Sequence, residues 1–277
     1  MECQLDNITI HYEAFGEGRP IVMLHGWPAD HFTCMRYFEP VFERRSGWRR
    51  IYPDLPGMGK TSGMDWIRNQ DDVLDIVLDF ISHIVPGRNV SIAGYSYGGY
   101  LVQGIVYQKP ALLDGVCLLT PVTANLLSDE KEHSLPRHIT LVEDKALLEE
   151  LEPDEAKMFQ NVFVVQNRKT LDEVKDYYTR AIKLTDFEFL SRLHKNFRFT
   201  FDVCALAEPF DSPTLILTGR QDSSAGYRGA WDILENYPRA TFAVLDRAGH
   251  NIPLESEILW HVLVNEWLDR VEEHSSS

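Results

Sequence analysis

The chain has 277 residues, of which 44% are hydrophobic, and it carries a formal net charge of −15. This length and composition suffice for one large globular core with an insertion. The negative charge argues against nucleic-acid partners and anionic membrane surfaces, because both require basic patches. No apolar run approaches the ~18 to 20 residues of a membrane span, and the N-terminus lacks the features of a signal peptide, so we expect a cytoplasmic protein.

Strand and helix patterns alternate over the first 120 residues. Apolar, β-branched runs predict strands at 8–12, 19–24, 90–93 and 115–119. Helical patterns predict helices at 32–42, 70–84 and 97–108. Such alternation predicts βαβ units and a parallel sheet.

After Pro121 the alternation stops. Residues 122–205 carry helical patterns only, at 144–151, 153–165 and 171–184. Strand character returns at 213–219 and 241–245, and helices are predicted at 227–235 and 256–271. In the last helix a core-facing stripe is predicted from Ile258, Leu259, Val262, Leu263 and Trp267.

One strand runs directly into a serine flanked by glycines. Residues 94–98 read G-Y-S-Y-G and match the G-x-S-x-G nucleophile elbow. In such an elbow a sharp strand-to-helix turn strains the serine backbone and exposes its hydroxyl. The glycines let the chain pass close to its neighbours. A helix-length stretch follows, so the context that the motif requires is present, and Ser96 is the predicted nucleophile.

An acid and a histidine follow in the order that this elbow requires. The strand at 213–219 leads into Asp222, and the strand at 241–245 leads into His250. Both loops are expected to leave the carboxyl edge of the sheet, where Ser96 also lies. An imidazole can take the serine proton and return it, and a carboxylate orients the imidazole.

Other aspartates compete for the role of the acid. Asp211 precedes its strand and therefore lies at the wrong end of the sheet. Asp246 lies closer to its own strand end and stays a second candidate. Asp222 has the alternative role of a loop or helix cap, and His250 that of a surface histidine, although it lies after the last strand with a glycine before it.

The loop after the strand at 19–24 is the predicted oxyanion loop. One donor is expected to be the backbone N–H of Tyr97, directly after the nucleophile. The second is assigned to the backbone N–H of Trp27, because Gly26 permits a tight backbone and Pro28 has no N–H to give. His25 is expected to order this loop by hydrogen bonds rather than to take part in the chemistry.

Together these motifs resemble the α/β-hydrolase fold in its single-domain, cap-bearing form. The matching pieces are H-G-W-P at 25–28, D-L-P-G-M-G at 54–59, G-Y-S-Y-G-G at 94–99, G-R-Q-D at 219–222 and A-G-H at 248–250. The resemblance implies a mostly parallel eight-stranded α/β sheet flanked by helices. It also implies a core made of residues 1–121 and 206–277, with a helical cap at 122–205 inserted after strand 6. Ser96 disfavours haloalkane dehalogenases and soluble epoxide hydrolases, which carry an aspartate at the elbow.

No metal site and no cofactor are predicted. The four cysteines lack the short spacing of metal ligands and are expected to be free thiols. The acidic run at 149–155 lacks the glycine and the spacing of a calcium loop. We expect a small-molecule substrate and a monomer or homodimer.

Aromatic residues of the cap are candidates for an apolar wall over the serine, although aromatics at helical spacing more often pack in a core. They are Phe159, Phe163, Tyr177, Tyr178, Phe187 and Phe189.

The sequence favours a cofactor-independent serine hydrolase acting on a small, largely apolar ester. Ser96 attacks the carbonyl, His250 moves the proton, Asp222 orients His250, and water releases the acyl-enzyme. Three alternatives stay open: a carbon–carbon bond hydrolase or lyase on the same triad, a proline iminopeptidase-like enzyme whose acidic cap groups hold the substrate amine, and a small-molecule sensor with little turnover.

Overall fold

An eight-stranded sheet forms the centre of the computed structural model, which describes residues 1–127 and 135–275, apart from the side chains of residues 125 and 177–179. The strands are β1 (Glu2–Gln4), β2 (Thr9–Phe15), β3 (Arg19–Leu24), β4 (Trp48–Pro53), β5 (Val90–Tyr95), β6 (Leu113–Leu119), β7 (Thr214–Gly219) and β8 (Ala240–Leu245). Their order in the sheet is β1-β2-β4-β3-β5-β6-β7-β8. The β1–β2 and β2–β4 pairs are antiparallel, and all other neighbours are parallel. The predicted mostly parallel sheet is confirmed.

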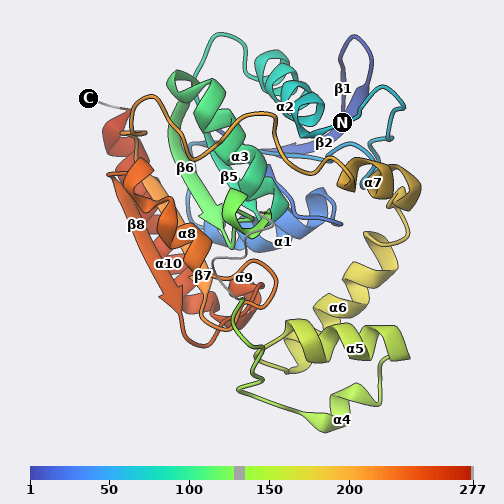
Figure 1. Cartoon of the computed structure of the whole chain (residues 1–277). Coiled ribbons are helices and arrows are strands. Elements are labelled where there is room, and N and C mark those ends of the chain that lie inside the picture. The colour runs from blue at the N-terminus through green and yellow to red at the C-terminus, as the bar shows by residue number, and fades with distance from the viewer. Residues whose placement is uncertain (128–134, 276–277) are drawn as a thin grey trace.

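Helices cover both faces of this sheet (Figure 1). They are α1 (His31–Phe42), α2 (Gln70–Ile84), α3 (Tyr97–Gln108), α8 (Arg228–Asp232), the 3₁₀ turn η1 (Pro110–Leu112), the 3₁₀ turn η3 (Leu234–Asn236), α9 (Ile252–Glu255) and α10 (Glu257–His274). Successive side chains along each strand point to opposite faces of the sheet, because the strand is pleated. Val22 and Leu24 pack in the core with α2 and α3, whereas Ile21 and Met23 pack in the core with α1 and α10.

The core-facing stripe predicted for the last helix is right for Trp267, which is buried, and for Leu263, which packs against the core, but wrong for its other three residues. Ile258 is 80% exposed, and Leu259 and Val262 are also exposed. The buried face of α10 instead consists of Trp260, Val264, Trp267, Leu268 and Val271. Both sets recur at helical spacing, so the periodicity could not decide which of two apolar stripes faces the sheet.

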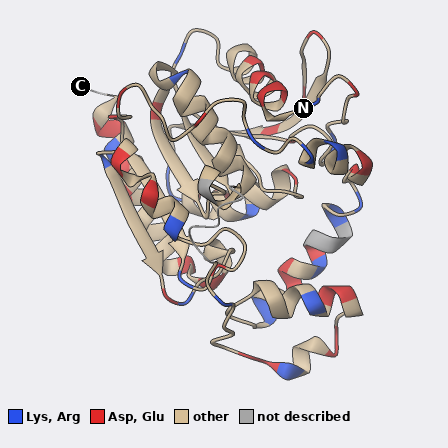
Figure 2. Cartoon of the chain, in the orientation of Figure 1, with Lys and Arg blue, Asp and Glu red and all other residues tan. Residues whose placement is uncertain are grey.

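The segment between β6 and β7 is helical in its described part. It contains the 3₁₀ turn η2 (Ala124–Leu127) and the helices α4 (Lys145–Leu148), α5 (Pro153–Val162), α6 (Arg168–Arg180) and α7 (Phe187–His194). Figure 1 shows α4, α5 and α6 gathered outside the sheet, while α7 returns toward α2. Charged residues lie along these helices, whereas the strands at the centre of the sheet carry few charged residues (Figure 2). This arrangement is that of a helical cap, and its bounds at 122 and 205 stay a prediction.

The described cysteines are free thiols: Cys3, Cys34 and Cys117 are buried, and Cys204 is half-buried. Among the helices of the described residues, none is long and apolar enough to cross a membrane.

Candidate active site

Ser96 lies in a strained turn between β5 and α3. Its φ is 55° and its ψ is −112°, in the region that favours glycine, as expected for a nucleophile elbow. Backbone hydrogen bonds hold this turn, because the Ser96 N–H donates to the Leu119 carbonyl at 2.9 Å. A Cβ atom at Gly98 would lie 2.2 Å from the Leu24 carbonyl oxygen, so only glycine fits there.

His250 and Asp222 are hydrogen-bonded to each other. His250 Nδ1 lies 2.9 Å from Asp222 Oδ2, and the Asp222 side chain is fully buried. The other oxygen of Asp222 accepts the backbone N–H groups of Ser224 and Ala225 at 2.8 and 3.0 Å. Because the carboxylate accepts from Nδ1, the neutral ring carries its lone pair on Nε2, which is the tautomer that a general base requires.

The two competing aspartates, Asp211 and Asp246, are not the residues bonded to the His250 ring. Asp211 and Asp246 are both exposed, whereas the imidazole of His250 is hydrogen-bonded to Asp222. The structure therefore favours Asp222 as the partner of His250.

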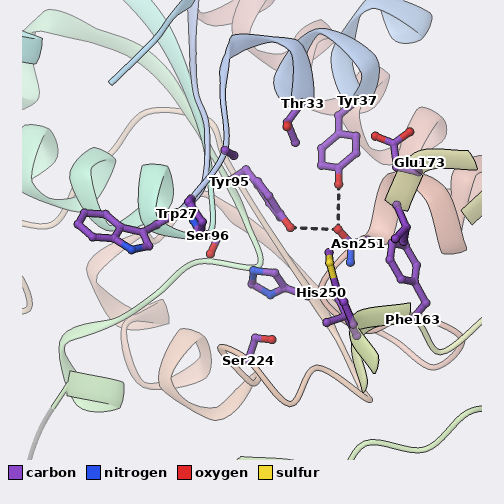
Figure 3. Close-up of a pocket in the computed structure, with 15 residues that line it drawn as sticks. Trp27, Thr33, Tyr37, Tyr95, Ser96, Phe163, Glu173, Ser224, His250 and Asn251 are labelled. Atoms are coloured by element: carbon purple, nitrogen blue, oxygen red, sulfur yellow. Dashed lines mark hydrogen bonds between the residues drawn. The ribbon is translucent and has the colours of Figure 1, made fainter. Parts of the chain in front are cut away.

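Ser96 and His250 both line a cavity of about 230 Å³ between the core and the cap (Figure 3). The core contributes Trp27, Pro28, Ala29, Thr33, Tyr37, Tyr95, Ser224 and Asn251 to its wall, and the cap contributes Met158, Val162, Phe163, Glu173 and Val174. Loops from the carboxyl ends of β3, β5, β7 and β8 thus meet at one edge of the sheet, as predicted.

The predicted oxyanion loop borders the serine. Trp27 lines the cavity, and Tyr97 is the first residue of α3, where backbone N–H groups have no acceptor within the helix. A Cβ atom at Gly26 would lie 3.3 Å from Ser96 Cβ and 3.0 Å from the Tyr95 ring, so the loop needs a glycine to come this close. These positions support the assigned donors, whose role stays a prediction.

His25 is buried beneath this loop and away from the cavity lining. Its Nδ1 donates to the Gly26 carbonyl at 2.8 Å, and its Nε2 accepts from the Leu55 N–H at 3.0 Å. Burial lowers the pKa of His25, which keeps the ring neutral and Nε2 able to accept. The contacts support the predicted role of ordering the loop.

Asn251 was not found from the sequence, where nothing but its place after His250 marks it. Its Oδ1 accepts the hydroxyls of Tyr37 and Tyr95 at 2.9 and 3.1 Å, drawn as dashed lines in Figure 3. Burial raises the pKa of Tyr37 well above its ordinary value, so this donor stays protonated. The two bonds fix the backbone next to the histidine.

Glu255, at the end of α9, was also missed. One oxygen accepts the N–H groups of the cap residues Val164 and Val165 at 2.5 and 3.3 Å. The other accepts the Gly249 N–H at 2.8 Å. Burial raises the pKa of Glu255 against the lowering effect of these donors. One buried carboxylate therefore joins the cap to the loop that carries His250.

Glu173 of α6 brings a carboxylate to the cavity wall. Its Oε2 lies 2.7 Å from Arg36 Nη2. Burial raises the pKa of Glu173, and the charge of Arg36 opposes this. The acidic group is therefore already paired with a cation.

The predicted aromatic wall holds for Phe163, which lines the cavity. Phe159 is instead fully buried in the core with α1 and α10, Phe189 packs in the core with α2 and α3, and Phe187 is exposed. The side chains of Tyr177 and Tyr178 lie outside the described residues. The described cap side of the cavity is lined by Met158, Val162, Phe163, Glu173 and Val174, whereas Phe159 and Phe189 pack in the two core clusters.

Residues 21–258 match the family model described as the alpha/beta hydrolase family. The chain belongs to the α/β hydrolase family. This confirms the predicted family and fold and the prediction of an α/β-hydrolase-type enzyme.

Two curated relatives match this chain over most of their own length. A pimeloyl-[acyl-carrier protein] methyl ester esterase of Legionella pneumophila (strain Corby) is 23% identical, over 94% of this chain and 100% of its own. A non-heme chloroperoxidase, CPO-A1, of Kitasatospora aureofaciens is 25% identical, over 90% of this chain and 91% of its own.

Among solved structures, an alpha/beta superfamily hydrolase from Oenococcus oeni PSU-1 has a TM-score of 0.85 and 26% identity, and covers 98% of this chain and 99% of its own. A thermophilic esterase from Thermogutta terrifontis has a TM-score of 0.71 at 18% identity, over 95% of this chain and 94% of its own.

Proposed function

We propose that this protein is a serine esterase in which Ser96, His250 and Asp222 form the catalytic triad. The observation that carries the proposal is the 2.9 Å contact of His250 Nδ1 with buried Asp222, in a histidine that shares a cavity with the strained Ser96. The esterases among the curated relatives support the reaction type.

In this proposal Ser96 Oγ attacks the ester carbonyl while His250 Nε2 takes its proton. The backbone N–H groups of Trp27 and Tyr97 stabilise the oxyanion. His250 then protonates the leaving alcohol, and a water molecule activated by the same nitrogen hydrolyses the acyl-enzyme. No cofactor enters these steps.

The cavity favours a small acyl group. Its volume of about 230 Å³ is below the ~300 to 1,000 Å³ typical of sites for drug-sized ligands. Met158, Val162 and Val174 give its cap side an apolar surface. We therefore propose short esters as substrates. A cytoplasmic location and a monomer or homodimer stay predictions from the sequence.

A proline iminopeptidase-like activity is the second candidate, because Glu173 places a carboxylate in the wall where a substrate amine could bind. Arg36 already forms an ion pair with that carboxylate, so Glu173 is less available to bind a substrate amine, and we favour the esterase over the peptidase. Turnover of prolyl naphthylamide above that of short esters would reverse this order.

Labelling by a fluorophosphonate probe, followed by intact mass, tests the proposal. We expect one adduct, mapped to Ser96 and absent from Ser96→Ala. A panel of p-nitrophenyl esters from acetate to octanoate should then show the highest kcat/KM for the short chains. Failure of folded protein to react with the probe would contradict an activated serine and favour a sensor. Labelling without ester turnover would favour the carbon–carbon bond hydrolase or lyase.

A further inference from the structure

A second cluster of histidine and carboxylate side chains lies away from the cavity, where β2 meets the start of α1. His11 and Glu13 are two residues apart on β2 and so share one face of the strand. His31 is the first residue of α1. One nitrogen or oxygen atom from each of the three side chains lies within 4.8 Å of the other two.

His11 brings an unpaired nitrogen to this cluster. Its side chain is nine-tenths buried, and Nε2 has no hydrogen-bond partner among the described residues. A Glu13 oxygen lies 3.5 Å from Nε2, which allows an ion pair when the ring is protonated but leaves the neutral nitrogen without a hydrogen bond. Because a buried polar atom without a hydrogen bond is unfavourable, a further ligand on this nitrogen would stabilise the neutral ring.

A carboxylate orients the ring of His31, as is common for histidines that bind metal ions. Its Nδ1 lies 2.8 Å from Oδ1 of the fully buried Asp54, which also accepts the backbone N–H groups of His31 and Lys60. A carboxylate on one ring nitrogen fixes the orientation of the ring and leaves the lone pair of the neutral imidazole on the other nitrogen. Asp54 would thus orient a metal-binding His31 without contacting the ion itself.

We propose that His11, Glu13 and His31 form a binding site for a divalent metal ion of the zinc type. Two imidazoles and one carboxylate are donors that zinc prefers, and a water molecule would complete a tetrahedron. His31 binds through the nitrogen that Asp54 does not occupy, and His11 binds through its unpaired Nε2.

One of the three distances, that between His11 and Glu13, is already close to what such a site needs. Bonds of about 2.0 to 2.1 Å place neighbouring ligand atoms of a tetrahedral zinc site about 3.3 Å apart. His11 Nε2 and Glu13 Oε1 are already 3.5 Å apart, so the ion needs mainly an approach of His31. The Met1 ammonium lies 3.8 Å from the same Glu13 oxygen and is the group that the ion would displace.

Isothermal titration of the full chain with zinc chloride, without a polyhistidine tag, tests the site. We expect saturable binding of one ion per chain, with an affinity at least tenfold lower in Glu13→Gln and in His11→Gln. His83→Gln is the matched control, because His83 is an exposed histidine of α2, and it should bind as the parent does. Glu13 is half-buried, so its variant keeps the test valid if the buried His11→Gln fails to fold.

The cobalt form supplies a second readout. Cobalt(II) bound to His11, Glu13 and His31 should give the visible absorption of a tetrahedral site, and Glu13→Gln should lose or shift that band. The proposal is overturned by the absence of saturable zinc binding, by equal binding in Glu13→Gln and the parent, or by binding that disappears in His250→Gln instead, which would place the ion at the triad.

Discussion

The His250–Asp222 pair and the His31–Asp54 pair are built alike but lie in different surroundings. In each, Nδ1 of the histidine lies within 2.9 Å of a fully buried carboxylate. The ring of His250 borders a cavity shared with Ser96, whereas His31 lies in a cluster with His11 and Glu13. A histidine–aspartate pair therefore does not by itself identify a triad. What the second ring nitrogen can reach decides between proton transfer and metal binding or structural support.

The largest contrast between the pairs is expected in turnover. Asp222→Asn should lower kcat for the best short ester by roughly 10⁴-fold, because the amide favours the wrong tautomer of His250. Asp54→Asn, the matched variant, should keep kcat within about tenfold, since no step of the proposed mechanism uses that carboxylate. Steady-state kinetics on both variants check this, and equal losses would remove the distinction between the pairs.

The free energy of unfolding should show the opposite order, with the larger loss in Asp54→Asn. Lys60 donates a backbone N–H to one oxygen of Asp54 and His31 donates to the other, so either orientation of an amide puts its NH₂ against a donor. Asp54→Asn should lower the free energy of unfolding by about 2 to 3 kcal/mol. Asp222→Asn should lower it by less than about 1 kcal/mol, because the neutral His250 ring can change tautomer and accept from the amide. Urea unfolding of both proteins measures the difference, and a larger loss for Asp222→Asn would contradict this account.

His250 lines a cavity, and the wall of that cavity should set acyl selectivity. Met158→Ala enlarges the cap side and should shift kcat/KM toward longer acyl chains by roughly tenfold. Met35→Ala is the control, because Met35 is also half-buried but does not line this cavity. A chain-length profile measured on both variants checks the shift. An unchanged profile for Met158→Ala would place the acyl group elsewhere.

The smallest predicted effect is on the pH dependence of stability and concerns His25, whose ring nitrogens bind backbone groups instead of a carboxylate. Burial holds its pKa below the ordinary value, so the unfolded chain binds more protons than the folded one between the folded pKa and about 6.5. The stability from neutral His25 is complete above about pH 6.5 and is lost as the pH falls toward the folded pKa. His25→Gln should therefore remove up to about 1 kcal/mol of the decline in unfolding free energy between pH 6.5 and 5.5.

Denaturant unfolding across this pH range, with His83→Gln as control, measures the slope. If His25→Gln retained the slope of the parent, protonation of His25 would not be its source.

The sequence predicted the sheet, and the meeting of a few loops at one of its edges, because both follow from topology. Ser96, Asp222 and His250 each follow a strand end, and parallel strands bring such ends to one edge. Residue type and order were therefore enough to propose them.

The sequence could not predict partners that depend on loop geometry. Glu255 reaches the backbone of Val164, and His31 reaches Asp54, over separations that no strand or helix period encodes. The cluster of His11, Glu13 and His31, which we propose as a metal site, was not anticipated for the same reason, because it joins a strand and a helix that follow different periods. On α10, Ile258 looked as suitable for the core as Trp260, and only the packing against the sheet distinguishes them.

The carboxylate of Glu255 has a consequence for how the enzyme opens. It holds the N–H groups of Val164 in the cap and Gly249 beside His250 at the same time. Any movement of Val164 away from the core would break a hydrogen bond to the same carboxylate that holds Gly249, next to the proposed general base His250. If the proposed mechanism holds, we expect opening of the cap and misalignment of His250 to be coupled, so that a molecule with its cap displaced cleaves ester more slowly. Hydrogen exchange at Val164 and the turnover rate should accordingly rise and fall in opposite directions when Glu255 is changed.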